Sequence, residues 1–236
     1  MKESPLVAQA YDYLRQEIIT CRLQPNEKLS DNNIAKQLNI SRAPVREALL
    51  RLQMDGLVQL NEEDRLCVST INYNDIADIL SVRTALESEA IMLIAEKGWL
   101  TPEQTEALAQ LHERFQSTID FEHVALNYEI DDQFHHTLVS YSESPRIIEI
   151  LDRMQLQMQR ARWLNIVNPQ RHMHAIEEHT ALLDAIVAQD VDAAVNCMRL
   201  HLMNSRAAFC SILQSKTIQN ITNTINAFFL TNNSDL

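Results

Sequence analysis

The chain has 236 residues, of which 46% are hydrophobic and 22% charged, a balance typical of a folded globular protein rather than a disordered or collagen-like one. It contains no run of about 18 apolar residues, and its first residues lack the apolar core of a signal peptide, so we expect a cytoplasmic protein with no membrane segment. The two glycines, Gly56 and Gly98, are too few for glycine-rich phosphate loops or multi-hairpin β folds. A mostly helical protein is therefore expected.

The net charge of −12 is unevenly distributed along the chain. Residues 1–70 hold nine Lys/Arg and ten Asp/Glu, a net charge of −1, whereas the remainder carries −11. This asymmetry indicates two domains with different partners, and it leaves nucleic-acid binding open for the first domain. We place the domains at 1–72 and 73–216, followed by an Asn/Thr-rich, partly ordered tail at 217–236.

The four cysteines show no C-x-x-C spacing, so we predict small buried side chains rather than disulfides. They are Cys21, Cys67, Cys197 and Cys210.

Residues 7–21 are predicted to form the first helix, because their apolar side chains recur at steps of three, four and one. Pro25 lies in the segment that ends this helix. Ser30 and Asp31 offer N-cap oxygens to a short second helix, and Asn39 tolerates the left-handed backbone of a tight connection. The apolar residues of the first helix are Val7, Ala10, Tyr11, Leu14, Ile18 and Ile19.

A third helix is predicted from Ser41, its N-cap, to about Asp55, with Pro44 in the first turn and Gly56 as the C-terminal cap. Its apolar face should be buried against the other two helices. Residues 58–60 and 66–68 then alternate as two strands around a polar turn at 61–65. Three helices and a small hairpin form a winged helix-turn-helix pattern. The apolar face consists of Val45, Ala48, Leu49 and Leu52.

From Tyr73 onward only helical periodicity is found, with Pro102, Pro145 and Pro169 at the breaks. Thr101 is predicted to cap the start of one of these helices, with Pro102 at its first position. We therefore expect a mostly α protein, in which an N-terminal winged helix-turn-helix is followed by an all-helical antiparallel bundle. The predicted segments lie near 74–97, 102–118, 123–141, 145–164, 173–188 and 191–214.

Arg42 and Arg46 are four residues apart at the start of the third helix, so they share one face. A helix that lies in the major groove of DNA must present such donors from its first turns. The alternative is a solvated face on which Arg46 and Glu47 form local ion pairs, and the spacing alone does not separate the two.

Asp131 and His135 are also four residues apart, and His179 and His201 lie on two later helices. If the four side chains converge inside the bundle, three imidazoles and a carboxylate suit Zn²⁺, Ni²⁺ or Mn²⁺. Two alternatives stay open: the histidines are simply hydrogen-bonded, or Asp132 supplies the carboxylate.

Arg83 is the candidate for recognising an acid, because a buried guanidinium offers a planar fork to a carboxylate. Its alternative is a helix-surface pair with Glu87, four residues later. Arg160 and Arg162 are further pocket candidates.

The segment Ser41-Arg42-Ala43-Pro44-Val45-Arg46-Glu47-Ala48-Leu49, with Gly56-Leu57-Val58 after it, resembles the DNA-binding domain of the GntR family of bacterial transcription regulators. The resemblance implies that Ser41, Arg42, Ala43 and Arg46 approach DNA, with Asn32 at a further contact position. The chain departs from the family at the wing, where Glu62-Glu63-Asp64 stands before Arg65. Because three carboxylates would repel phosphates, we expect Arg65 alone to contribute there.

The resemblance continues at Asp131-x-x-Phe134-His135 and Glu178-His179-x-x-Leu182, which look like the FCD effector domain of the FadR subfamily. In members that contain a metal, the equivalents of Asp131, His135, His179 and His201 are its ligands, and the equivalent of Arg83 points into the effector cavity.

We therefore expect a homodimeric, ligand-responsive regulator that binds a double-stranded DNA operator, with repression relieved by a small organic or sugar acid. A second hypothesis is a metal-dependent hydrolytic enzyme that uses the three-His-one-Asp site, for which His136 or Glu178 could serve as general base. A third is that the metal is purely structural.

Overall fold

The computed structural model describes residues 4–70, 73–118, 124–162 and 169–214. The chain divides into two compact units, the first built mainly from residues before Tyr73 and the second mainly from residues after it. The predicted domain limits at 72 and 216 stay predictions, and the predicted tail at 217–236 lies outside the described residues.

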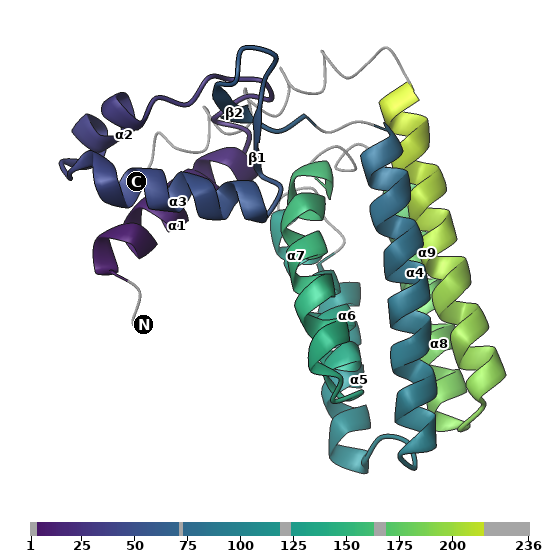
Figure 1. The fold of residues 1–236 in the computed structure, drawn as a ribbon. Helices are drawn as coiled ribbons and strands as arrows, with labels where there is room; N and C mark the ends of the chain where they lie inside the picture. The colour runs from purple at the N-terminus through teal and green to yellow at the C-terminus, as the bar shows by residue number, and fades with distance from the viewer. Residues whose placement is uncertain (1–3, 71–72, 119–123, 163–168, 215–236) are drawn as a thin grey trace. The chain divides into compact units, whose positions relative to one another are not determined.

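The first unit consists of helices α1 (Pro5–Ile19), α2 (Asp31–Leu38) and α3 (Arg42–Met54) and the hairpin of β1 (Val58–Leu60) and β2 (Leu66–Val68) (Figure 1). The strands are antiparallel, with Gln59 opposite Cys67, and Lys28 adds an isolated bridge to Cys67. The apolar residues predicted for the inner faces of α1 and α3 are all buried. The winged helix-turn-helix prediction is thus confirmed.

The connection between α2 and α3 forms as predicted, because Asn39 adopts the left-handed conformation with φ 53° and ψ 43°. Gly56, at φ +75°, follows the last turn of α3. Ser41 occupies the N-cap of α3, as predicted, although its side chain makes no capping hydrogen bond. Pro44 stands at the third helical position, where the N–H that an N-cap oxygen would accept is missing.

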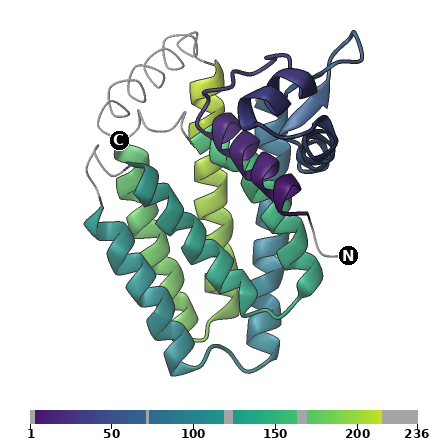
Figure 2. The same ribbon diagram turned by 90° about the vertical axis from the view of Figure 1, so that its left-hand side faces the viewer.

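The second unit is a bundle of helices that lie roughly side by side in both views (Figures 1 and 2). The helix α4 packs on α6 and α9, α8 packs on α5 and α9, and α5 packs on α6. Apolar cores lie between α4, α6 and α7 and between α5, α6 and α8. The helices are α4 (Tyr73–Glu96), α5 (Pro102–Ser117), α6 (Val124–Ser140), α7 (Pro145–Arg162), α8 (Pro169–Val187) and α9 (Val191–Gln214).

The predicted helical segments correspond to these helices, with one boundary four residues off. The helix α8 begins at Pro169 rather than near residue 173, since proline is well accommodated at a first helical position. At the start of α5, Thr101 and Gln104 form a reciprocal capping box. The four cysteines are free thiols; Cys21, Cys67 and Cys210 are buried as predicted, whereas Cys197 is only partly buried. Among the described helices, none has both the length and the hydropathy that crossing a membrane requires.

Candidate functional site

The residues predicted to contact DNA are all exposed, and most of them surround the start of α3. Arg42 and Arg46 both bind the carboxylate of Asp31 on α2, with an Arg42 Nη2 to Asp31 Oδ2 distance of 2.9 Å. The partner is thus Asp31, not the neighbouring Glu47. The six exposed residues are Asn32, Ser41, Arg42, Ala43, Arg46 and Arg65.

The two arginines hold Asp31 in its charged form, because hydrogen bonds from Arg46 and Arg42 lower the pKa of its carboxyl group. The arginine side chains are 53% and 60% exposed, so this is a surface ion pair that contributes only about 0–1 kcal/mol. We therefore expect a phosphate or a base edge to replace Asp31 as their partner at little energetic cost.

At the wing, Asn61 Oδ1 accepts the backbone N–H groups of Glu63 and Arg65, both at 3.0 Å, and so shapes the turn. The Glu63 carboxylate receives Lys28 Nζ at 2.9 Å and Arg65 Nε at 3.6 Å. One of the three acidic side chains is therefore neutralised locally, and Arg65 is engaged with it.

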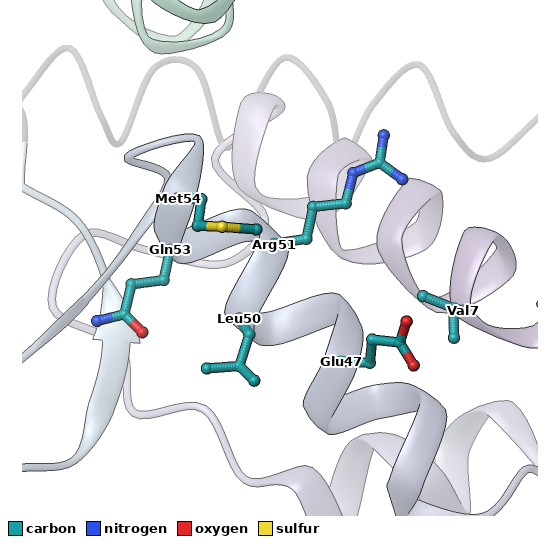
Figure 3. A pocket seen from close by; sticks show the side chains of 6 residues that line it. All are labelled: Val7, Glu47, Leu50, Arg51, Gln53 and Met54. Atoms are coloured by element: carbon teal, nitrogen blue, oxygen red, sulfur yellow. The ribbon is translucent and has the colours of Figure 1, made fainter. Parts of the chain in front are cut away.

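A surface hollow of about 660 Å³ lies between α1 and α3 of the first unit (Figure 3). Its one guanidinium belongs to Arg51, which stacks over the Tyr11 ring with its Cζ atom 4.0 Å from the ring centroid. The hollow thus lacks the cluster of hydrogen-bond donors that would bind the carboxylate of an acid effector. The candidate effector site therefore remains the one predicted in the bundle. The lining residues are Val7, Glu47, Leu50, Arg51, Gln53 and Met54.

In the bundle, α6, α8 and α9 bring the predicted metal ligands together. Asp131, His135, His179 and His201 each offer one donor atom, and these atoms lie within 4.8 Å of one another. The three imidazoles are buried and Asp131 is 18% exposed, so the carboxylate faces the more open side. The carboxylate in this cluster is that of Asp131, and not its rival Asp132.

Two of the imidazoles are oriented by carboxylates behind them. His135 Nδ1 lies 2.7 Å from Glu87 Oε2, and His201 Nδ1 lies 2.8 Å from Glu178 Oε2. Since an ionised carboxylate can only accept, each Nδ1 carries a hydrogen, and in the neutral form of each imidazole Nε2 then presents a lone pair. Burial alone would raise the pKa of Glu87. Arg83 and His135 outweigh this effect and lower the pKa to about 2, so this carboxylate is charged.

The two Nε2 atoms lie 3.1 Å apart. If both carry lone pairs, this approach is repulsive without a cation between them. A metal at about 2.0–2.1 Å from each nitrogen would set them roughly 2.9–3.4 Å apart. The observed separation of the two Nε2 atoms therefore matches that of two ligands bound to the same metal ion.

His179 differs from the other two imidazoles, because both of its ring nitrogens are buried without a hydrogen-bond partner among the described residues. Its ring is stacked on Phe134, with centroids 4.5 Å apart and planes at 13°. Burial, then the neighbouring His201, lowers its pKa well below the usual value, so the ring is neutral at pH 7. A neutral imidazole nitrogen that lacks a hydrogen-bond partner and lies beside the Asp131 carboxylate is suited to bind a transition metal.

Arg83 lies in the interior of the bundle, 5% exposed, and its Nε donates to Glu87 Oε1 at 2.7 Å. The predicted alternative pairing with Glu87 is therefore real, although it is buried rather than on the surface. Within the described residues this is the single hydrogen bond of the Arg83 guanidinium, so its Nη donors remain for a ligand. The side chains of Arg160 and Arg162 lie outside the described part of the chain.

Three residues support the site without having been predicted in that role from the sequence: Glu87, Glu178 and Arg171. Arg171 Nη2 donates to Glu178 Oε2 and to Ser205 Oγ, both at 2.8 Å. Glu178 directly precedes His179, and this adjacency suggests a role in the site but does not reveal that its carboxylate serves His201 on another helix.

Neither residue nominated as the general base of a hydrolase is suited to that role. His136 is 58% exposed and lies 3.3 Å from Asp152, so it does not belong to the buried cluster. Glu178 is engaged by His201, Arg171 and Asn204, which lower its pKa against the opposing effect of burial.

A winged helix-turn-helix with exposed arginines, followed by a helical bundle with a buried polar cluster, defines a DNA-binding regulator with a ligand-sensing domain. Residues 6–68 match the bacterial regulatory proteins of the gntR family, and residues 78–204 match the FCD domain. The chain therefore belongs to the GntR family of transcription regulators and carries an FCD domain. GntR regulators bind DNA operators and usually dimerise, and FCD domains often bind a metal.

Relatives over nearly the full length are also regulators, which supports this class over the hydrolase. The transcriptional repressor RspR of Escherichia coli K12 is 26% identical over 216 residues, covering 90% of this chain and 92% of RspR. The regulator McbR of the same strain is 26% identical over 200 residues, covering 84% and 90%. The solved structure of E. coli McbR matches with a TM-score of 0.70 at 25% identity, covering 88% of this chain and 98% of that chain.

Proposed function

We propose that this regulator is a homodimeric repressor whose bundle holds Zn²⁺, Ni²⁺ or Mn²⁺ and senses a small organic or sugar acid. The convergence of three buried imidazoles and a carboxylate within 4.8 Å carries this proposal. The ligands are Asp131, His135, His179 and His201. The repressor assignment is supported by the likeness to RspR.

Arg83 anchors the acid through its Nη donors, which have no other partner in the described residues. A bound metal would supply open coordination positions for an oxygen of the same acid. Two-point recognition by a guanidinium and a metal favours small carboxylates, because a planar fork matches a carboxylate and Zn²⁺, Ni²⁺ and Mn²⁺ all accept oxygen ligands.

DNA is bound by the exposed start of α3, through Ser41, Arg42, Ala43 and Arg46, with Asn32 on α2 and Arg65 at the wing. Two copies of the winged unit are needed because one recognition helix reads too few base pairs for useful specificity. An acid acts by binding the DNA-competent and incompetent arrangements of the dimer unequally.

The metal site is tested by stripping the protein with a chelator, reloading it with Zn²⁺, Ni²⁺ or Mn²⁺ singly, and measuring bound metal and thermal stability. We expect about one ion per chain with a raised melting temperature. His136→Ala is the matched control, since His136 neighbours a ligand on α6 but is exposed. A wild-type protein that takes up none of the three ions contradicts the proposed site.

The regulator is tested by selecting bound fragments from a genomic DNA library with the metal-loaded protein at a stated salt concentration, because the phosphate contribution depends on salt. Recovery of a few inverted-repeat sites supports a dimeric operator-binding protein. Release of these sites by one class of small acid supports the proposed sensing, whereas indifference to every acid tried in a panel of metabolic carboxylates contradicts it.

A further inference from the structure

Two chains of contacts lead from an arginine through a carboxylate to a proposed metal ligand. The inner relay consists of Arg83, Glu87 and His135, with distances of 2.7 Å at both contacts. The outer relay consists of Arg171, Glu178 and His201, with distances of 2.8 Å at both contacts. Both relays end at the two Nε2 atoms that lie 3.1 Å apart.

The two relays differ in burial and in the number of supporting donors. The side chains of Arg83 and Glu87 are 6% and 2% exposed, whereas those of Arg171 and Glu178 are both 11% exposed. Glu178 also accepts a hydrogen bond from Asn204 Nδ2 at 2.7 Å. Within the described residues, Glu87 has Arg83 and His135 as its partners. Loss of Arg83 would therefore leave Glu87 without a second donor, whereas Glu178 without Arg171 would still have Asn204.

We propose that Glu87 is a positioning residue that joins the acid anchor Arg83 to the metal ligand His135, so that acid binding and metal binding change each other's affinity. This inference rests on the proposed function for both sites. One Glu87 oxygen receives Arg83 and the other receives His135, so a shift of the guanidinium toward an acid alters the acceptor that fixes the imidazole. Such coupling is reciprocal by thermodynamic necessity.

The coupling can be measured without knowing the acid, because Zn²⁺ alone reports the state of His135. In Glu87→Gln, the amide has one acceptor oxygen for two donors, and its NH₂ end favours the His135 tautomer whose Nε2 carries a hydrogen. We expect Zn²⁺ affinity to fall by about 10- to 100-fold, the range for lost outer-shell partners. Arg83→Met, which removes the donor that orients Glu87, should weaken Zn²⁺ binding by about tenfold.

The decisive comparison is the double variant Arg83→Met/Glu87→Gln. If Arg83 acts through Glu87, the double variant binds Zn²⁺ no more weakly than Glu87→Gln alone. Arg171→Met on the outer relay should weaken Zn²⁺ binding by at most about threefold, because Asn204 still holds Glu178. Arg146→Met, at an exposed arginine of α7, controls for loss of charge.

Additive losses in the double variant, or an unchanged Zn²⁺ affinity in Glu87→Gln, would overturn the inner relay. A wild-type protein that binds no Zn²⁺, Ni²⁺ or Mn²⁺ overturns the proposed metal site itself, so the two failures are distinguishable. The tautomer of His135 in the metal-free protein, read by ¹⁵N NMR, should shift toward the Nε2–H form in Glu87→Gln, a change that a purely structural role would not produce. If Arg83→Met does not fold, the Zn²⁺ affinity and the His135 tautomer of Glu87→Gln still decide whether the inner relay exists.

Discussion

The start of α3 and the interior of the bundle use the same ionic groups in opposite environments. On the surface, Arg42 and Arg46 share the carboxylate of Asp31, and both arginines are more than half exposed. In the bundle, Arg83 and His135 share the carboxylate of Glu87, and all three side chains are almost fully buried. We expect DNA to replace Asp31 in the surface pairs at little energetic cost, whereas the buried carboxylate fixes which nitrogen of His135 carries the hydrogen.

The largest expected effect is on DNA binding by Arg42→Ala/Arg46→Ala. Each arginine lost from a base or phosphate contact costs about 1–3 kcal/mol, so we expect operator affinity to fall by roughly 100-fold or more. Fluorescence anisotropy with an operator duplex at fixed salt measures this change, and the bound metal should be unaltered. Arg153→Ala, an exposed arginine of α7, is the control. Undiminished operator binding by the double variant is incompatible with the proposed interface.

Next in size is the loss of metal in His179→Ala, because this residue is one of four proposed ligands and its ring nitrogens have no hydrogen-bond partner in the described residues. We expect metal affinity to fall at least about 100-fold, beyond the range for outer-shell groups. Metal analysis and acid-dependent operator release are measured together. A variant that unfolds more easily but still releases DNA in response to the acid would instead indicate a structural metal.

A smaller effect is expected from pH on the metal-free protein. Burial lowers the pKa values of His179 and His201 in the folded chain, so the unfolded chain binds more protons below a pH of about 6.5. Stability should therefore be full above about pH 6.5 and should fall as the pH drops toward 5. Urea unfolding at a series of pH values measures this slope, and a metal-free protein equally stable at pH 5 and pH 7 contradicts it.

The smallest effect is expected from Asp31→Ala, which frees Arg42 and Arg46 from their shared carboxylate. Because the pair is exposed, we expect a small change in stability but a few-fold tighter binding to nonspecific DNA at low salt. Titrations at several salt concentrations measure both affinity and salt dependence. Weaker binding would mean that Asp31 orients the arginines for DNA rather than competing with it.

The secondary structure could be predicted well because its determinants are local. The periodicity of Val7, Ala10, Tyr11 and Leu14 marks the buried face of α1, and Asn39 marks the turn before α3. Ser41 was also identified correctly as the N-cap of α3, and its side chain makes no capping hydrogen bond because Pro44, at the third helical position, has no N–H to donate.

The candidate metal site was predicted only in part from local spacing. The four-residue step from Asp131 to His135 is visible in any helical reading, but their approach to His179 and His201 depends on tertiary packing and was expected chiefly from the family resemblance. The carboxylate behind His135 comes from a residue 48 positions away, and no local pattern encodes that contact. For the same reason the four-residue step from Arg83 to Glu87 left two hypotheses open, an acid anchor or a surface pair, and did not show that the two residues are paired and buried.

The cluster draws its donors from three helices, with His135 and His201 separated by 66 residues of sequence. An ion held there would act as a non-covalent cross-link across long chain segments, which restricts the unfolded chain and resists local opening. Its presence should slow amide hydrogen exchange in α6, α8 and α9 together rather than in any one of them. Metal supply would then set the rigidity of the sensing domain as well as the chemistry of its pocket.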